Sequence, residues 1–194
     1  MGDKSEQKKK YIVETARTVF ANKGYKEVTM KDIVEACDIS RGGLYLYFPG
    51  TKELFEEVLL LEQQDTGEEL AESISKAAAP SDVLALFLKE QKKELLSKKP
   101  SLTKAIYEYF FANKVPGKEN VLKQQFDGAV YIVEKLIAAG VDAGEFYCED
   151  PRRAASNIMY VLEGLKIASQ TRGITEGAID REIMYIMQGL VVEE

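Results

Sequence analysis

The segment SRGGLYLYF, residues 40–48, brings together side chains that can bind a phosphate or the edge of a base. Arg41 carries a guanidinium group, which donates hydrogen bonds to phosphate oxygens or to guanine. Tyr45 and Tyr47 add hydroxyl groups, and the Leu46 side chain can contact the methyl group of thymine. These residue types are typical of a surface that contacts nucleic acid.

Two glycines lie in the same segment, and each weakens a helix by about 1 kcal/mol relative to alanine. Without side chains, Gly42 and Gly43 would let a helix that begins at Ser40 approach DNA closely. The alternative is that glycine is simply tolerated in the first turn and that the tyrosines are half-buried. The elements on either side of the segment decide between these interpretations.

The residues before this segment predict a helix, a short turn and a second helix. Thr29 is a suitable N-cap with Asp32 three residues later, a variant of the capping box. Residues 29–36 and 40–48 then form the two helices, and Asp38 in the turn tolerates a left-handed conformation. A small apolar core is expected from Ile33, Val34, Ile39, Leu44 and Phe48. This helix-turn-helix pattern favours DNA binding, because the start of its second helix enters the major groove.

Helical periodicity continues through nearly the whole chain, and no run alternates as a strand does. A first helix ends at Gly24, and Thr51 is expected to cap a fourth helix that runs into the 60s or 70s. Asp150 followed by Pro151 is a strong helix start. Five later helices are expected over residues 81–98, 101–113, 118–140, 151–171 and 176–191. The sequence therefore predicts an all-α protein.

The composition excludes several classes of site. The chain of 194 residues has no histidine, which excludes zinc chemistry and histidine-based triads, so no metal and no cofactor are expected. A helical-bundle enzyme is disfavoured, since the sequence has no Glu-x-x-His pair, phosphate loop or nucleophile elbow. No apolar run approaches a membrane span and no secretory signal is apparent. Two cysteines without a disulfide pattern indicate a reducing, cytoplasmic location.

The net charge of −6 is unevenly distributed. Residues 1–52 have a balance of +3, and the remaining residues have a balance of −9. A basic end on an acidic body fits a nucleic-acid-binding domain joined to a domain with another kind of partner. Chance distribution of solvated charge explains the same numbers equally well.

The stretch TVFANKGYKEVTMKDIVEACDISRGGLYLYF, followed by KELF, resembles the DNA-binding domain of TetR (tetracycline-repressor-type) regulators over residues 9–57. The resemblance implies a nine-helix homodimer, with a three-helix DNA-binding domain at residues 1–52 and a helical ligand-binding and dimerisation domain at residues 53–194. It also implies phosphate contacts for Thr29, Lys31 and Tyr45. The full set of expected DNA-binding residues is Thr29, Lys31, Ser40, Arg41, Gly42, Gly43, Tyr45, Leu46, Tyr47 and Lys52.

Three features depart from the family pattern. Cys37 and Asp38 replace the usual alanine and glycine, which puts a carboxylate near the DNA face. The PGT connection is one residue longer than usual, and Gly43 replaces a small hydroxyl residue or alanine. The operator sequence therefore cannot be predicted.

The body of the chain contains an aromatic group that is either core or the lining of a ligand pocket. The family resemblance implies a mainly apolar cavity with a few polar anchors. The acidic balance of the body disfavours a strongly anionic ligand, so a hydrophobic or cationic small molecule is expected. The expected lining residues are Phe87, Tyr107, Phe110, Phe111, Phe126, Tyr131, Asn157 and Gln170.

The last two predicted helices each carry an apolar stripe that is interpreted as a dimer interface, with monomer core as the alternative. The stripes comprise Ala155, Ile158, Met159, Leu162, Leu165, Ile179, Ile183, Ile186, Met187 and Leu190. Two-fold symmetry would place two recognition helices on a near-palindromic DNA operator.

The expected function is a ligand-responsive repressor that releases its operator when a small-molecule effector binds the C-terminal domain. The alternative is a helical small-molecule-binding or scaffolding protein without specific DNA binding, which the acidic balance and Asp38 would suit.

Overall fold

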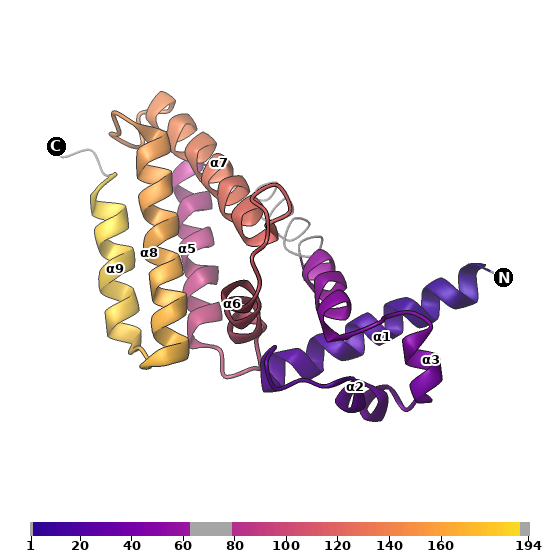
Figure 1. Ribbon diagram of the computed structural model, residues 1–194. Coiled ribbons are helices and arrows are strands. Elements are labelled where there is room, and N and C mark those ends of the chain that lie inside the picture. The colour runs from indigo at the N-terminus through magenta and orange to yellow at the C-terminus, as the bar shows by residue number, and fades with distance from the viewer. Residues whose placement is uncertain (1, 63–78, 191–194) are drawn as a thin grey trace. The chain divides into compact units, whose positions relative to one another are not determined.

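The computed structural model describes residues 2–62 and 79–190, and within these residues it contains nine helices and no strand (Figure 1). The all-α prediction is confirmed. The helices are α1 (Gly2–Lys23), α2 (Met30–Cys37), α3 (Arg41–Tyr45), a helix over residues 51–62, α5 (Pro80–Leu96), α6 (Thr103–Ala112), α7 (Val121–Asp142), α8 (Pro151–Thr171) and α9 (Glu176–Gln188).

Local capping chemistry sets several helix boundaries as the sequence predicts. At the start of α2, the Thr29 hydroxyl accepts from the Asp32 N–H while the Asp32 carboxylate accepts from the Thr29 N–H. Asp38 ends this helix in the left-handed conformation, with φ of 50°. Asp150 caps α8 by accepting from the Arg153 N–H.

Two expectations about the third and fourth helices are corrected. The third helix was expected over residues 40–48, but α3 ends at Tyr45 and the next two residues form a turn. The fourth helix begins at residue 51, and the Leu54 N–H donates to the Gly50 carbonyl, so the cap lies one residue before Thr51. Any continuation of this helix beyond residue 62 lies outside the described residues.

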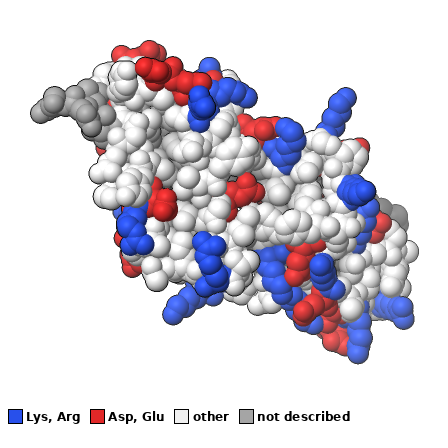
Figure 2. Space-filling model, turned by 60° about the vertical axis from the view of Figure 1, so that its left-hand side comes forward, with Lys and Arg blue, Asp and Glu red and all other residues white. Residues whose placement is uncertain are grey.

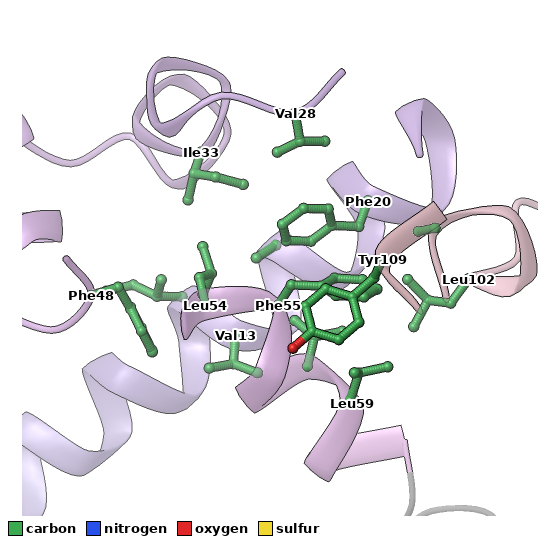
Figure 3. Close-up of a cluster of buried hydrophobic side chains, with 14 of the residues drawn as sticks. Val13, Phe20, Val28, Ile33, Phe48, Leu54, Phe55, Leu59, Leu102 and Tyr109 are labelled. Carbon is green, nitrogen blue, oxygen red and sulfur yellow. The ribbon is translucent and has the colours of Figure 1, made fainter. Parts of the chain in front are cut away.

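The described helices fall into two compact units, and α6 belongs to the first of them with α1, α2, α3 and the helix over residues 51–62. Their side chains share one apolar core (Figure 3). Buried members include Ile12, Ala16, Phe20, Ile33, Leu44, Phe48, Leu54, Phe55, Leu102 and Tyr109. The packing unit therefore extends beyond residue 52, whereas the functional division at that point stays a prediction.

Aromatic contacts attach α6 to the rest of the first unit. The Tyr109 ring lies 5.1 Å from Tyr25 and 5.3 Å from Phe55, measured between ring centroids. Phe55 in turn makes an edge contact with Phe20 at 4.7 Å. Edge-on aromatic pairs of this kind contribute about 1 kcal/mol beyond the burial of their surface.

The second unit consists of α5, α7, α8 and α9 around a separate apolar core. Its buried residues include Leu84, Leu88, Val133, Ile137, Phe146, Ala155, Ile158, Leu162, Leu165, Ile186 and Leu190. Lys92 of α5 forms ion pairs with Glu176 and Asp180 of α9. No helix in the described part of the chain is long and apolar enough to span a bilayer.

Candidate nucleic-acid interface

Most of the predicted DNA-binding residues lie at the surface of the first unit. Eight of the ten are exposed, and Gly43 and Tyr47 are half-buried. Leu46 is the most exposed of the large apolar side chains in the described residues, at 84%. An apolar side chain that contributes nothing to its own core is available for contact with another molecule. The exposed residues are Thr29, Lys31, Ser40, Arg41, Gly42, Tyr45, Leu46 and Lys52.

Arg41 and Tyr45 pack against each other on the exposed face of α3. The guanidinium carbon of Arg41 lies 5.6 Å from the centroid of the Tyr45 ring, which is a cation–π contact. The spacing of four residues places both side chains on one face of the helix. Stacking on the ring restricts the flexible Arg41 side chain and holds its donors on the outer surface.

At the start of α2, the predicted phosphate contacts lie within a charged network. Lys23 pairs with Asp32, and Lys31 pairs with Glu35 at 3.6 Å. The hydrogen bonds from Lys23, and then those from Thr29, hold the pKa of the Asp32 carboxyl well below its usual range. Asp32 therefore stays charged and keeps the first turn of α2 in place.

The two glycines of α3 have different surroundings, and the DNA contact expected for both stays a prediction. A Cβ atom at Gly42 would meet no other atom within 4 Å, so this residue can approach a ligand closely. A Cβ atom at Gly43 would lie 3.1 Å from Oγ of Ser40, the residue that caps α3, and 3.8 Å from Nζ of Lys8. Gly43 thus makes room for the cap of α3, and it lies beside Lys8 of α1.

Three polar contacts join α6 to the rest of the first unit. The Tyr109 hydroxyl donates to Glu56 at 2.6 Å, and the Lys26 N–H donates to Glu108 at 3.0 Å. The Lys104 ammonium group donates to the Lys23 carbonyl at 3.2 Å. Burial, and then the hydrogen bond to Glu56, raises the pKa of the Tyr109 hydroxyl, which therefore keeps its proton.

Gly24, at the end of α1, lies next to the side chains of α6. This residue has φ of 87°, which favours glycine. A Cβ atom there would lie only 2.7 Å from Oε2 of Glu108. The sequence identified Gly24 as a helix end but gave no sign of this contact.

The eight predicted ligand-binding residues are divided between the two units. Tyr107, Phe110 and Phe111 lie on α6 in the first unit, and the other five lie in the second unit. Phe111 is 83% exposed, and its ring lies 6.3 Å from that of Tyr107. In the second unit Phe87 and Phe126 pack against the core, whereas Tyr131, Asn157 and Gln170 are exposed. Their shared role as a pocket stays a prediction.

The predicted dimer stripes point into the core of a single chain. Seven of the ten residues are buried there, and the other three, Met159, Ile183 and Met187, are half-buried, so the monomer-core alternative accounts for their burial. The opposite faces of the same helices expose apolar side chains instead. These are Tyr160 and Ile167 on α8, and Met184 and Tyr185 on α9. The buried residues are Ala155, Ile158, Leu162, Leu165, Ile179, Ile186 and Leu190.

Positive charge in the first unit is largely paired with carboxylates. Lys9, Lys10, Arg17, Lys23, Lys31 and Lys52 each form an ion pair. Figure 2 likewise shows basic and acidic side chains interspersed on one face of the molecule. The net balance of +3 over residues 1–52 therefore does not form one continuous basic patch on that face.

Two protein-family models match this chain, one in its N-terminal part and one in its C-terminal part. The model of the bacterial regulatory proteins of the tetR family matches residues 12–58, and the tetracyclin repressor-like C-terminal domain matches residues 83–180. The uncharacterized HTH-type transcriptional regulator YfiR of Bacillus subtilis is 33% identical over 145 residues, which is 72% of this chain and 68% of that protein. The HTH-type transcriptional repressor AcnR of Corynebacterium glutamicum is 26% identical over 192 residues, covering 98% of this chain and 95% of that protein.

Solved structures show the same fold. A transcriptional regulator from Saccharomonospora viridis, determined in complex with choline, superposes with a TM-score of 0.84 at 19% sequence identity, over 97% of this chain and 100% of that chain. A TetR-family regulator from Agrobacterium tumefaciens superposes with a TM-score of 0.80 at 15% identity, over 96% of this chain and 99% of that chain. The two family matches and the relative at 33% identity establish that the chain belongs to the TetR family of DNA-binding transcriptional regulators, which are not enzymes.

Proposed function

We propose that this protein is a ligand-responsive repressor that binds a near-palindromic operator as a homodimer and releases it when a small, mainly apolar effector binds the C-terminal domain. The observation that carries the proposal is the exposed outer face of α3, where Arg41 packs on Tyr45, together with Leu46 directly after the helix at 84% exposure. None of these three side chains is buried in the core of the chain. Their chemistry suits the major groove.

We assign separate roles to the exposed residues. Arg41 reads a base edge or binds a phosphate, and Leu46 contacts a thymine methyl group. The Tyr45 hydroxyl, Thr29, Lys31 and Lys52 bind the DNA backbone and fix the position of α3 in the groove. The open space around Gly42 lets the backbone of α3 come close to the DNA.

We propose that dimerisation uses the exposed faces of α8 and α9. On α8, Tyr160, Gly164 and Ile167 recur at helical spacing, and a Cβ atom at Gly164 would meet no other atom within 4 Å. Large apolar side chains exposed at this spacing, around a glycine that allows close approach, fit a self-complementary helix interface. On α9, Met184 and Tyr185 extend the same kind of surface.

We propose that Glu56 couples effector binding to DNA binding, because it contacts residues on both sides. It accepts from Tyr109 of α6 and lies 3.9 Å from Lys52, one helical turn earlier. Because α6 also carries Tyr107, Phe110 and Phe111 of the proposed pocket, a shift of α6 on effector binding would displace the helix that begins beside α3. A coupling of about 1–3 kcal/mol would be enough to change operator occupancy severalfold.

The salt dependence of binding to duplex DNA tests this function against the alternative of a helical protein without DNA binding. A dimer that neutralises several phosphates should lose affinity steeply as salt rises, because each contact releases about 0.9 counterion. A flat response, or no binding at low salt, would favour the small-molecule-binding or scaffolding alternative.

A further inference from the structure

The N-terminal turns of α1 lie beside Gly43 of α3 and Tyr47 of the turn that follows it. Oγ of Ser5 donates a hydrogen bond of 3.4 Å to the Tyr47 hydroxyl. One turn further along α1, Lys8 places its Nζ 3.8 Å from the position that a Cβ atom of Gly43 would occupy. In Figure 1 the first turns of α1 pass beside α3. A lysine of α1 is thus held next to the proposed recognition helix.

Charge pairing distinguishes Lys8 from the two lysines that follow it. Lys9 pairs with Glu57 at 2.9 Å and lies over the Phe48 ring, so it attaches α1 to the neighbouring helix. Lys10 pairs with Glu14 at 3.8 Å. Lys8 is exposed, and no carboxylate of the described residues forms an ion pair with it.

The Lys8 ammonium group lies beside Gly43, a residue that has no side chain and no charge. Within the described residues it has no ion-pair partner that would neutralise it. An ammonium group without such a partner, at the edge of a DNA-reading helix, attracts an anion. When α3 enters the major groove, the nearest anions are the phosphates along the edge of that groove.

We propose that Lys8 is a further DNA-binding residue, which extends the interface from the helix-turn-helix onto α1 by contacting a backbone phosphate. This inference rests on the proposed function, since it takes α3 as the element that enters the groove. As a point charge on a flexible side chain, Lys8 would contribute affinity without reading sequence.

The test compares Lys8→Ala with Lys10→Ala, two variants that remove one exposed positive charge each from neighbouring positions. Binding of the full-length protein to a mixed-sequence duplex of about 30 base pairs, roughly three helical turns, is measured across salt concentrations. For each protomer bound, Lys8→Ala should reduce the magnitude of the slope of log K against log salt by about 0.9. Between 1 M and 0.1 M salt, the affinity of this variant for DNA should therefore rise about eightfold less than that of wild type. Lys10→Ala should leave the slope close to wild type, and Lys8→Arg should restore it.

Equal slopes for Lys8→Ala and Lys10→Ala, with wild type still binding steeply, would overturn the assignment of Lys8 and leave the proposed function standing. Absence of binding by wild type would instead remove the proposed function itself. Since both side chains are exposed, neither variant should change the urea midpoint of unfolding, which is measured as a check on folding.

Discussion

The Tyr109 hydroxyl donates a 2.6 Å hydrogen bond to Glu56, which joins α6 to the helix that begins beside the proposed DNA-reading surface. The two residues are 53 positions apart in the sequence. Tyr109 is almost fully buried and its ring also packs on Phe55, so the contact combines a polar link with an apolar one. Because Glu56 also forms an ion pair with Lys52 at 3.9 Å, a chain of two contacts links α6 to Lys52.

Replacing Tyr109 with phenylalanine should weaken both stability and coupling. The ring packing is kept, but Glu56 loses a donor, so the free energy of unfolding should fall by about 1.5–3 kcal/mol. Urea unfolding measures this change. The matched control is Tyr147→Phe, because the exposed Tyr147 hydroxyl also donates to a carboxylate, that of Glu149 at 3.3 Å. The control should cost no more than about 0.5 kcal/mol. A similar loss in both variants would mean that the hydrogen bond from Tyr109 to Glu56 contributes no more to the free energy of unfolding than the exposed one.

Asp32 should make the stability of the protein depend on acid pH. Its pKa is lowered in the folded state, so its stabilising contribution is present above the ordinary carboxyl pKa of about 3.9 and is lost as the pH falls below that value. Asp32→Asn should remove this part of the pH dependence and cost about 1 kcal/mol at neutral pH. Urea unfolding at pH 7 and at lower pH checks the expectation.

The control for Asp32 is Glu35→Gln, which breaks the exposed pair with Lys31 on the same helix. An exposed pair at this spacing contributes about 0.2–0.5 kcal/mol, so this variant should keep nearly all of the stability and its acid dependence. If Asp32→Asn followed the same pH curve as wild type, the network with Lys23 and Thr29 would not be the cause of acid sensitivity.

Much of the first unit follows from the sequence, because its boundaries depend on local chemistry. Thr29 and Ser40 each accept a backbone N–H from three residues later, as their types and positions predict. Asp150 does the same at the start of α8 in the second unit. Long-range pairs such as Tyr109 with Glu56, or Ser5 with Tyr47, leave no periodic signal and could not be predicted.

The partner of the apolar stripes of α8 and α9 also could not be predicted from the sequence. Periodicity identifies the face of a helix that is buried, but it does not say whether the same chain or a second copy covers that face. Leu162 and Ile186 therefore looked suitable for a dimer interface and are buried in the chain's own core. The exposed Ile167 and Tyr185 lie outside those stripes, where polar neighbours obscure the pattern.

Ile167→Glu should separate the proposed dimer. A carboxylate on the exposed face of α8 would be buried without a partner in the interface, so the dimer dissociation constant should rise by at least about 100-fold. Sedimentation equilibrium measures this shift. Leu162→Ala is the control on the same helix: it should lower the free energy of unfolding by about 2–5 kcal/mol, because Leu162 is 1% exposed, and leave dimerisation in place. A dimer that resists Ile167→Glu would place the interface elsewhere.

Arg41→Ala should reduce discrimination between operator and random DNA. If Arg41 reads a base, operator binding should weaken by about 1–3 kcal/mol, with a much smaller loss on random DNA. Fluorescence anisotropy with both duplexes measures the two losses. Equal losses would assign Arg41 to a phosphate.

Two variants of Tyr45 separate its ring from its hydroxyl. Tyr45→Phe keeps the ring on which Arg41 stacks, so it should weaken binding to both duplexes by a similar factor. Tyr45→Leu removes the ring as well and should lose discrimination as Arg41→Ala does. Retained discrimination in Tyr45→Leu would show that the stacking does not position Arg41.

The most direct measurement is selection of bound duplexes from a random DNA pool, with and without cell metabolite extract. We expect recovery of an inverted repeat whose half-sites are about one helical turn apart or a multiple of it, and loss of that repeat when the extract contains the effector. Recovery of no sequence above background at low salt would contradict operator binding, and the exposed face of α3 would then need another explanation.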